Sequence, residues 1–408
     1  MKARLFITVL RLFSNDRKRE TPQYFSFPIS TGEDLAFSNL PTAVNLFIAD
    51  SPSDTGKEPY NASPYYWCSP DIWMRINNDS IQQHENPIFE TGHHYAYISV
   101  KVKNRGKGDG GGKWLHLYWA YSSTGISDRT WNGREYYMYN RLATGGYFPP
   151  QRTGSIASGD SKIFLFKWDI SPSSTWIGLP KNKQHICFYA KILDTAAEYG
   201  FVPGNTFFTP KENNNEAQRS IAVIDDKCLP TYAEILVPNV YDHSHTYSLE
   251  FIPASPYSAN FFANGYIEMS LPKNTEYDLV KSDDVQEIDT PTTSMPNRKR
   301  LSFRGRQTRL VGVNINPQEI LQLGIKFNIT NLNFLNTADT ISFHLIQRDE
   351  LNKITGAVTY IIPPISLSSS QISVSSENLS EGCVKLSAEM EDLQHVSWYD
   401  ENDKNNSP

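Results

Sequence analysis

The sequence lacks the short motifs that mark the common catalytic sites. It contains no G-x-S-x-G nucleophile turn, no H-E-x-x-H zinc motif and no P-loop, and Gly110, Gly111 and Gly112 stand outside the context of a phosphate-binding loop. We therefore expect a non-catalytic protein. A hydrolase stays open as an alternative, because an acid–base pair such as Asp71 with Glu90 depends on geometry rather than on a motif.

Cysteine is scarce, and so is positive charge. The four cysteines lie far apart and form no C-x-x-C pair, which excludes a zinc ribbon or a thioredoxin-type site. Cys187 lies in an alternating apolar run, so we expect it to be a buried core residue. The formal net charge of −6 gives no general attraction to nucleic acid, whose binding depends on neutralising phosphates. Nucleic acid is therefore not an expected partner.

Long apolar runs are also missing. No stretch approaches the roughly 18 apolar residues that a membrane-spanning helix needs, so we expect no membrane span. The N-terminus resembles a signal peptide only in part, because Arg4 and Arg11 interrupt its apolar residues and no small-x-small cleavage site follows. The alternative is an N-terminal strand that contains Phe6 to Val9.

Aromatic residues, proline and glycine are plentiful, and together they favour β-structure. Aromatic residues make up 12% of the chain, and its 25 prolines and 23 glycines are scattered along it. Aromatic side chains suit pleated surfaces, and scattered Pro and Gly suit many short strands joined by turns. We predict an all-β protein with two tandem antiparallel β-sandwiches at 42–230 and 231–365. An N-terminal strand or extension at 1–41 precedes them, and a polar, partly disordered tail at 366–408 follows.

Alternation along the expected strands indicates which side chains are buried. In 95–102 the even-numbered residues, from Ala96 to Val102, are all apolar and should face the core. The glycine-rich stretch 104–112 should be a hairpin loop, because glycine supplies the positive φ values of tight reversals. One helical turn is expected at 317–321, with proline in its first position.

A series of motifs within 42–225 resembles a recurring module of bacterial proteins. The order of the motifs carries the resemblance. Six motifs follow one another along the chain. They are a D-SP-D-G-EP turn at 50–59, an SPDIW signature at 69–73, a V-N-RG hairpin at 102–106, an LYWA strand at 117–120, a strand with His, Cys and Ala-Lys-Ile at 185–192, and an Asn-rich strand at 214–223. Lys191 departs from the Arg that is usual in the fifth motif. The module is an immunoglobulin-like sandwich similar to the CARDB-type adhesion modules.

The resemblance implies a function as well as a fold. CARDB-like modules are accessory units of exported bacterial proteins, sometimes beside peptidase domains, and they bring no catalytic residues with them. The resemblance implies a structural or protein-binding accessory module of a bacterial envelope or extracellular assembly, with an exported or envelope-associated location. A carbohydrate-binding module, with a glycan as the partner, is the alternative that the aromatic residues keep open.

Four carboxylates around one turn form a candidate calcium site. They are Asp50, Asp54, Glu58 and Asp71, and oxygen ligands of this type suit Ca²⁺. Their spacing is not that of an EF-hand. The alternative is that these carboxylates cap turns through hydrogen bonds to the backbone. Apart from this candidate ion, we expect no cofactor.

Histidines offer a second candidate metal site, for Zn²⁺ or another transition metal. The alternative is that these side chains are simply solvated. The candidate ligands fall into two groups: His84, Glu90, His93 and His94, and separately His243 with His245.

Aromatic residues in a loop-like region are candidates for an exposed partner-binding surface. An exposed aromatic group contacts a protein more often than a sugar. Trp73 and Trp119 belong to predicted strands and should be buried. The exposed candidates are Trp131, Tyr136, Tyr137 and Tyr139.

The segment 298–309 is strongly basic. Its residues Arg304, Arg306 and Arg309 are candidates for contacting an anionic partner. The alternative is a solvated edge strand whose charges prevent pairing with another sheet.

Overall fold

The fold comes from a computed structural model of the chain. The described residues are 43–58, 65–87, 95–125, 131, 145–170, 185–196, 213–224, 232–239, 241, 243–279, 285–288, 297–305, 308–317, 319–331, 334, 340–364, 373–379, 383–390 and 393–398. The predicted N-terminal strand or extension lies outside them.

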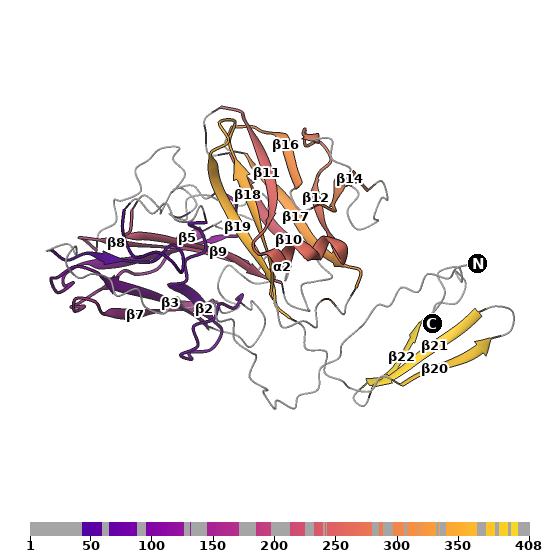
Figure 1. Cartoon of the computed structure of the whole chain (residues 1–408), viewed down its shortest axis with the longest axis horizontal. Helices are drawn as coiled ribbons and strands as arrows, with labels where there is room; N and C mark the ends of the chain where they lie inside the picture. Colours follow the sequence, from indigo (N-terminus) through magenta and orange to yellow (C-terminus); the bar gives the residue numbers. More distant parts are fainter. Residues whose placement is uncertain are drawn as a thin grey trace. The chain divides into compact units, whose positions relative to one another are not determined.

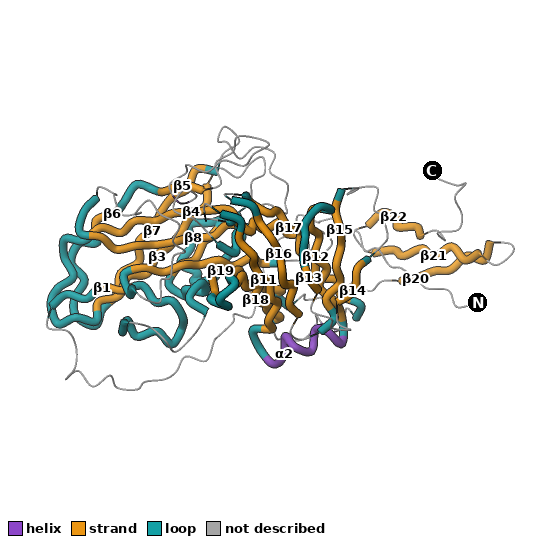
Figure 2. The backbone as a smooth tube through the Cα atoms, turned by 90° about the horizontal axis from the view of Figure 1, so that it is seen from above, coloured by secondary structure: helices purple, strands orange, loops and turns teal. Residues whose placement is uncertain are grey.

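The protein is all-β, which confirms the predicted fold class. Strands form nearly all of the regular structure in the described ranges, and helix is confined to short turns such as α2 (Pro256–Ala259) and η4 (Asn260–Ala263). Figure 2 shows the strands in orange and this helical stretch in purple. Among the described residues, no helix has the length and apolar character needed to cross a membrane.

A four-stranded antiparallel sheet forms one layer of a sandwich. β3 lies in its middle, with β1 and β2 on one side and β7 on the other. The even-numbered side chains of β3, from Ala96 to Val102, are fully buried, as the alternation predicts. The strands are β1 (Leu46–Phe47), β2 (Ile72–Arg75), β3 (Tyr95–Asn104) and β7 (Ser161–Asp169).

A ten-stranded sheet supplies the second layer. The two layers share one apolar core, which contains Ile98 and Phe166 of the first sheet together with Leu117 and Phe188 of the second. The buried positions predicted for Cys187, Trp73 and Trp119 are confirmed. In spatial order the strands are β13 (Asp278–Leu279), β16 (Thr308–Ile315), β11 (His245–Pro253), β18 (Ile341–Arg348), β19 (Ile354–Ile362), β9 (Glu216–Val223), β8 (Ile186–Leu193), β4 (Trp114–Tyr121) and β5 (Gly145–Tyr147), with β6 (Gln151–Arg152) also paired to β4.

The ten-stranded sheet contains strands from both of the predicted sandwiches. β9 and β19 pair in parallel, with Ala222 opposite Tyr360, and Figure 1 shows the two strands side by side. A continuous sheet therefore joins the two stretches. Their division into separate domains at residue 230 stays a prediction.

A five-stranded sheet packs on the other end of the ten-stranded sheet. Ring contacts join the two layers: Phe303 meets Phe251 with centroids 5.3 Å apart, and Phe327 meets Phe343 at 5.8 Å. The helical turn predicted at 317–321 is wrong, because Ile320 already begins a strand. In spatial order the strands are β10 (Ala233–Pro238), β17 (Ile320–Ile329), β12 (Gly265–Pro272), β15 (Arg298–Phe303) and β14 (Val285–Glu287).

The basic segment 298–309 is divided between these two sheets. β15 lies between β12 and β14, and β16 lies between β11 and β13. Both strands are therefore paired on two sides. The interpretation of this segment as an edge strand is wrong.

The glycine-rich stretch 104–112 connects the two layers of the first sandwich. β3 and β4, which flank it, belong to different sheets, so the predicted hairpin is wrong. The side chain of Asn104 holds the connection in place, since its Nδ2 donates to the backbone oxygens of Gly108 (2.7 Å) and Ile156 (2.8 Å). Its Oδ1 accepts from the backbone N–H of Gly106 at 2.9 Å. Hydrogen bonds of the Asn104 side chain thus hold this connection, where the sequence predicted a tight hairpin turn.

Three further strands lie in the range predicted as a polar tail. β20 (Ser373–Leu379), β21 (Cys383–Met390) and β22 (Leu393–Trp398) form an antiparallel sheet with β21 in the middle. The sequence did not predict these strands. The residues beyond 400, for which disorder was predicted, lie outside the described ranges.

Candidate functional site

Two of the four candidate calcium ligands bind backbone N–H groups. Asp54 accepts hydrogen bonds from the N–H groups of Asp50 (3.0 Å) and Gly56 (2.7 Å). Glu58 accepts one from the N–H of Asn214 at 2.7 Å. These contacts are of the turn-capping kind.

A third candidate, Asp71, is matched by a cation within the protein. Its Oδ2 accepts from the backbone N–H of Ala49 at 2.8 Å and lies 2.7 Å from Nζ of Lys103. That ammonium group also lies 5.5 Å from the ring centroid of Phe47. The ammonium group of Lys103 therefore already balances the negative charge of the buried Asp71.

Asp50 differs from the other three carboxylates. Its side chain is buried, and its Oδ1 has no hydrogen-bond partner in the described structure. Burial, together with the negative charges of Asp54 and Glu216, raises the pKa of Asp50 to about 9. Without a bound cation, Asp50 is therefore protonated at neutral pH, whereas a bound Ca²⁺ would favour its ionised form.

The described residues contain no group of three or more His, Cys, Asp and Glu side chains placed to hold a metal ion. Asp50, Asp54, Glu58 and Asp71 all belong to those residues. Their contacts favour the turn-capping alternative. The calcium site stays a prediction.

Three of the histidine candidates, His84, His243 and His245, belong to the described residues. His84 is buried, and its Nδ1 accepts from the backbone N–H of Met74 at 3.3 Å. His243 and His245 have ring centroids 5.7 Å apart and both contact the ring of Tyr241. The remaining candidates, Glu90, His93 and His94, lie outside the described residues.

The expected exposure of Trp131 is wrong. Its side chain is fully buried and stacks on Tyr189 of β8, with ring centroids 5.5 Å apart. The sequence around Trp131 indicates a loop, but packing against the outer face of a sheet buries the side chain. Tyr136, Tyr137 and Tyr139 lie outside the described residues, so their proposed role stays a prediction.

The three candidate arginines have different surroundings. Arg304 is exposed and lies over the ring of Tyr266, 4.4 Å from its centroid. Arg309 donates to Ser248 Oγ (2.7 Å) and Asn352 Oδ1 (3.1 Å), so its guanidinium helps to hold β11 against the turn after β18. Arg306 lies outside the described residues. The described part therefore offers Arg304 for an anionic partner.

A surface that the sequence did not single out is the outer side of β3 and β7. Phe164, Phe166 and Trp168 of β7 face the core, so alternation places the residues between them on the outside. Ile163 and Leu165 are 47% and 41% exposed there. We call this surface the β3–β7 face, and its members are Tyr95, Lys101, Ile163, Leu165 and Lys167.

Along the edge away from β3, the backbone of β7 pairs with no further strand in the described structure, although one of its oxygens accepts a side-chain hydrogen bond there. Lys101 directs its N–H to the backbone oxygen of Asp71, away from β7, at 2.8 Å. Ile163, which faces Lys101 in the register, is therefore in a non-hydrogen-bonded pair, and its own N–H and C=O point to the open edge. Leu165 has the same orientation, and its oxygen accepts from Nε2 of Gln151 at 2.8 Å. In the described structure, β7 pairs with no strand other than β3.

Two lysines flank the exposed apolar residues. Nζ of Lys167 lies 3.5 Å from the ring centroid of Tyr95, and neither Lys101 nor Lys167 has a carboxylate partner among the described residues. Asp169 lies opposite Tyr95 at the end of the strand. The centre of the β3–β7 face is therefore apolar with unmatched positive charge beside it.

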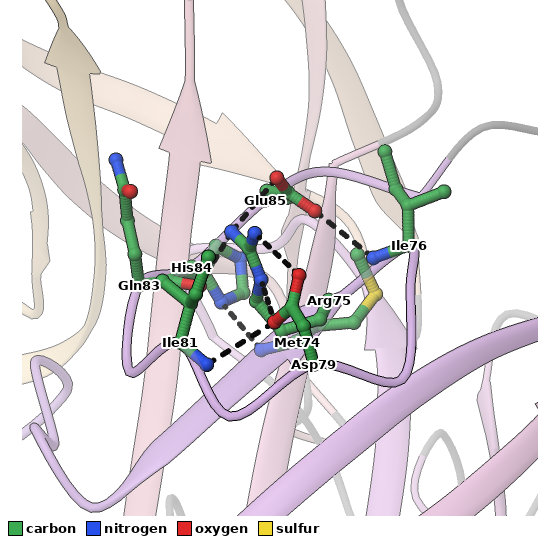
Figure 3. A network of polar contacts seen from close by, with 8 residues as sticks. All are labelled: Met74, Arg75, Ile76, Asp79, Ile81, Gln83, His84 and Glu85. Carbon is green, nitrogen blue, oxygen red and sulfur yellow. Dashed lines mark hydrogen bonds and ion pairs between the residues drawn. The ribbon is translucent and has the colours of Figure 1, made fainter. Parts of the chain in front are cut away.

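Arg75 holds the loop that follows β2 (Figure 3). Its guanidinium forms a bidentate pair with Asp79, at 2.9 and 3.0 Å, and contacts Glu85 Oε1 at 2.7 Å. Glu85 in turn accepts from the backbone N–H of Ile76 at 3.0 Å. Arg75 is buried, so its charge needs partners within the protein. The carboxylates of Asp79 and Glu85 supply them, and these contacts fix the loop.

Comparisons with known proteins give no family. No family model and no curated protein matches the chain. Similar solved structures include a β-glucosidase from Listeria innocua in complex with isofagomine (9% identity, 31% of this chain, 15% of that chain, TM-score 0.17). They also include the CupB6 tip adhesin from Pseudomonas aeruginosa (10% identity, 81% of this chain, 99% of that chain, TM-score 0.19). The chain thus spans 15% of the glucosidase, and at these TM-scores neither likeness carries an argument about function.

Proposed function

We propose that this chain is a non-catalytic binding protein, an accessory interaction module of a bacterial envelope or extracellular assembly. The setting rests on the resemblance to CARDB-like modules. The binding role rests on one observation, the open edge of β7 beside exposed Ile163 and Leu165. An extended segment of a partner protein pairs with this edge as an added strand.

The β3–β7 face indicates the chemistry of that segment. Complete burial of an aliphatic side chain contributes about 1.5–3 kcal/mol, so covering the exposed halves of Ile163 and Leu165 contributes roughly 1 kcal/mol each. The backbone hydrogen bonds of an added strand must supply much of the remaining binding free energy. Lys101 and Lys167 favour a partner segment with acidic residues beside its apolar ones.

Charge substitution on the β3–β7 face tests the proposal. The double variant I163E/L165E should lose the proteins that co-purify with the native chain, because two buried carboxylates would face the added strand. Leu351, which is 89% exposed at the turn between β18 and β19, provides the matched control L351E. Equal recovery of partners with the double variant and with L351E would contradict this binding site.

A carbohydrate-binding module is a second candidate, because a polar pocket lies between the two layers of the second half. The pocket has a volume of about 330 Å³. That volume is within the range of small-molecule sites, and amide and carboxylate groups suit hydroxyl-rich ligands. A glycan array with the native chain and with N314A distinguishes the two functions, since saturable binding that N314A removes would favour the sugar. The polar residues that line the pocket include Asn274, Glu276, Asn314, Asn316 and Glu319.

A further inference from the structure

Lys103 of β3 and Asp71 form a close pair of an amine and a carboxyl group. Nζ of Lys103 lies 2.7 Å from Oδ2 of Asp71, and the side chain of Asp71 is 5% exposed. Because Oδ2 is bonded to Cγ, the amine nitrogen also lies near that carbon. Groups held at such distances react far faster than separate molecules, with reacting atoms about 3–3.5 Å apart. The contact is therefore also the starting geometry for an amide bond.

Hydrogen bonds hold Asp71 in one position against β3. Its backbone oxygen accepts from the N–H of Lys101 at 2.8 Å, and its own N–H donates to Ser69 Oγ at 3.2 Å. The hydroxyl of Ser69 in turn donates to the backbone oxygen of Ala49 at 2.6 Å. Lys103 follows two residues after Lys101, so both side chains lie on the same side of β3. The backbone of the fold thus positions the pair.

A backbone N–H group binds the same carboxyl oxygen. Ala49 donates its N–H to Oδ2 of Asp71 at 2.8 Å. When an amine adds to a carboxyl carbon, negative charge develops on the carboxyl oxygens, and a fixed N–H group stabilises that charge. Lys191 and Glu216 form a second lysine–carboxylate pair, at 3.0 Å, in which a side-chain amide, Asn213 Nδ2, donates to the carboxylate at 3.1 Å. The backbone donor distinguishes Asp71 from Glu216.

Asp54 is a further carboxyl group held beside Asp71. Its Oδ2 accepts from the backbone N–H of Asp50 at 3.0 Å, and the preceding residue, Ala49, donates its N–H to Asp71. Consecutive N–H groups thus bind the two carboxyl groups. Asp54 is buried, and burial raises its pKa, which favours the protonated form that can give a proton to a departing oxygen.

The ring of Phe47 connects Lys103 with the turn that carries Asp54. Phe47 lies opposite Lys103 in the register of β1 and β3, and Nζ of Lys103 lies 5.5 Å from the ring centroid. Gly56, whose N–H donates to Oδ1 of Asp54 at 2.7 Å, lies against the same ring, since a Cβ atom at Gly56 would be 2.7 Å from Cγ of Phe47. Apolar cover favours neutral groups over an ammonium and a carboxylate, and an amine must be neutral to react.

We propose that Lys103 and Asp71 condense to an amide bond that cross-links β3 to the residue before β2. Nζ of Lys103 forms a bond to Cγ of Asp71, and the bond from Cγ to Oδ1 breaks. Two hydrogens of the ammonium group leave with that oxygen as water, and Asp54 transfers one of them from the nitrogen to the oxygen. The reaction needs no oxidant and no further reactant. The cross-link does not depend on the proposed binding role.

Mass spectrometry of the denatured full chain tests the cross-link. We expect a mass below that of the sequence by one water molecule. A tryptic digest should contain a branched peptide that joins 58–75 to 102–105, because trypsin does not cleave at an acylated lysine. K103R should lack both signs, since a guanidinium keeps the charge but does not form the amide. K191R, at the pair with Glu216, should keep both. A native digest with only the separate peptides would overturn the proposal.

Substitution of Asp54 tests the proton transfer. D54N should yield the separate peptides, because proton transfer by a positioned carboxyl group contributes about 10²–10⁴-fold to the rate of such a step. E58Q is the matched control, since Glu58 belongs to the same turn but binds the N–H of Asn214, and it should keep the branched peptide. A branched peptide in D54N, or its absence from E58Q, would overturn the role of Asp54. The native digest decides on the amide itself even if a variant does not fold.

Discussion

The backbone oxygen of Thr124 occupies the position that a Cβ atom on Gly356 would take. Gly356 lies in β19, and Thr124 follows the end of β4. Thr124 cannot withdraw easily, since its N–H donates to Leu236 O at 3.0 Å and its Oγ1 donates to Gln347 Oε1 at 2.5 Å. The absence of a side chain at 356 therefore lets the two halves of the ten-stranded sheet approach.

We expect G356A to lower the free energy of unfolding by about 1–3 kcal/mol, because overpacking forces backbone atoms apart. G111A is the control, since a Cβ at Gly111 meets no atom within 4 Å. It should change stability by no more than about 0.5 kcal/mol. Urea denaturation of both variants checks the prediction, and similar values for the two would contradict it.

His344 makes the structure sensitive to acid. Its ring stacks on Tyr65, with centroids 4.3 Å apart, and its Nδ1 lies 2.8 Å from Thr359 Oγ1. Burial lowers the pKa of His344 to about 4. The stability due to its neutral form is therefore complete above pH 6.5 and is lost as the pH falls towards 4. H344Q should show a smaller loss of stability over this interval in denaturation at a series of pH values. A loss equal to that of the native chain would contradict the assignment.

Arg75 should not be replaceable by lysine. R75K keeps the charge but loses the bidentate contact with Asp79, so the pair geometry that holds the loop after β2 is lost. We expect a loss of about 1–3 kcal/mol in the free energy of unfolding. R304K, at an exposed arginine over Tyr266, should stay within about 0.5 kcal/mol of the native value. Equal stability of R75K and R304K would show that the network does not hold the loop.

Local patterns predicted the strands and their buried sides but not the sheet partners. The alternation in β3 depends only on neighbours in the chain, so the burial of Ala96 to Val102 could be predicted. The connection 104–112 could not, because its conformation depends on a contact between Asn104 and the distant Ile156. The parallel pairing of β9 with β19 joins segments that are far apart in the sequence, and no turn signal announces it.

The candidate sites show the same limit. Carboxylates near turns could be identified from the sequence, whereas the burial of Asp50 depends on the surrounding fold. The free backbone edge of β7 depends on β7 lying at the border of its sheet, which the strand sequence does not reveal. Trp131 is buried because a distant strand carries Tyr189. Composition and spacing therefore identify residue types, and the tertiary pairing decides their roles.

Asp50 should make the chain less stable as the pH rises. Its pKa is raised to about 9 from an ordinary value of 3.8, so the stability due to its protonated form is complete below pH 3.8 and is lost as the pH approaches 9. The loss is at most about 1.4 kcal/mol for each pH unit. D50N removes this titration, so its stability relative to the native chain should increase between pH 4 and pH 9. A constant difference across that range would contradict a buried, protonated Asp50.

Bound Ca²⁺ would favour the ionised form of Asp50, whereas burial alone favours the protonated form. The native chain and D50N therefore also test the candidate metal site. If Asp50, Asp54, Glu58 and Asp71 bind Ca²⁺, the ion stabilises the ionised form of Asp50, and the native chain should melt at a higher temperature in millimolar Ca²⁺ than in chelator. A ligand at one hundred times its dissociation constant contributes about 2.7 kcal/mol. D50N should respond less, because an amide is a weaker ligand than a carboxylate. Carboxylates that only cap turns, as Asp54 does for Asp50 and Gly56, give the same melting curve in both conditions. Identical curves for the native chain would therefore contradict the calcium site and leave the turn-capping role.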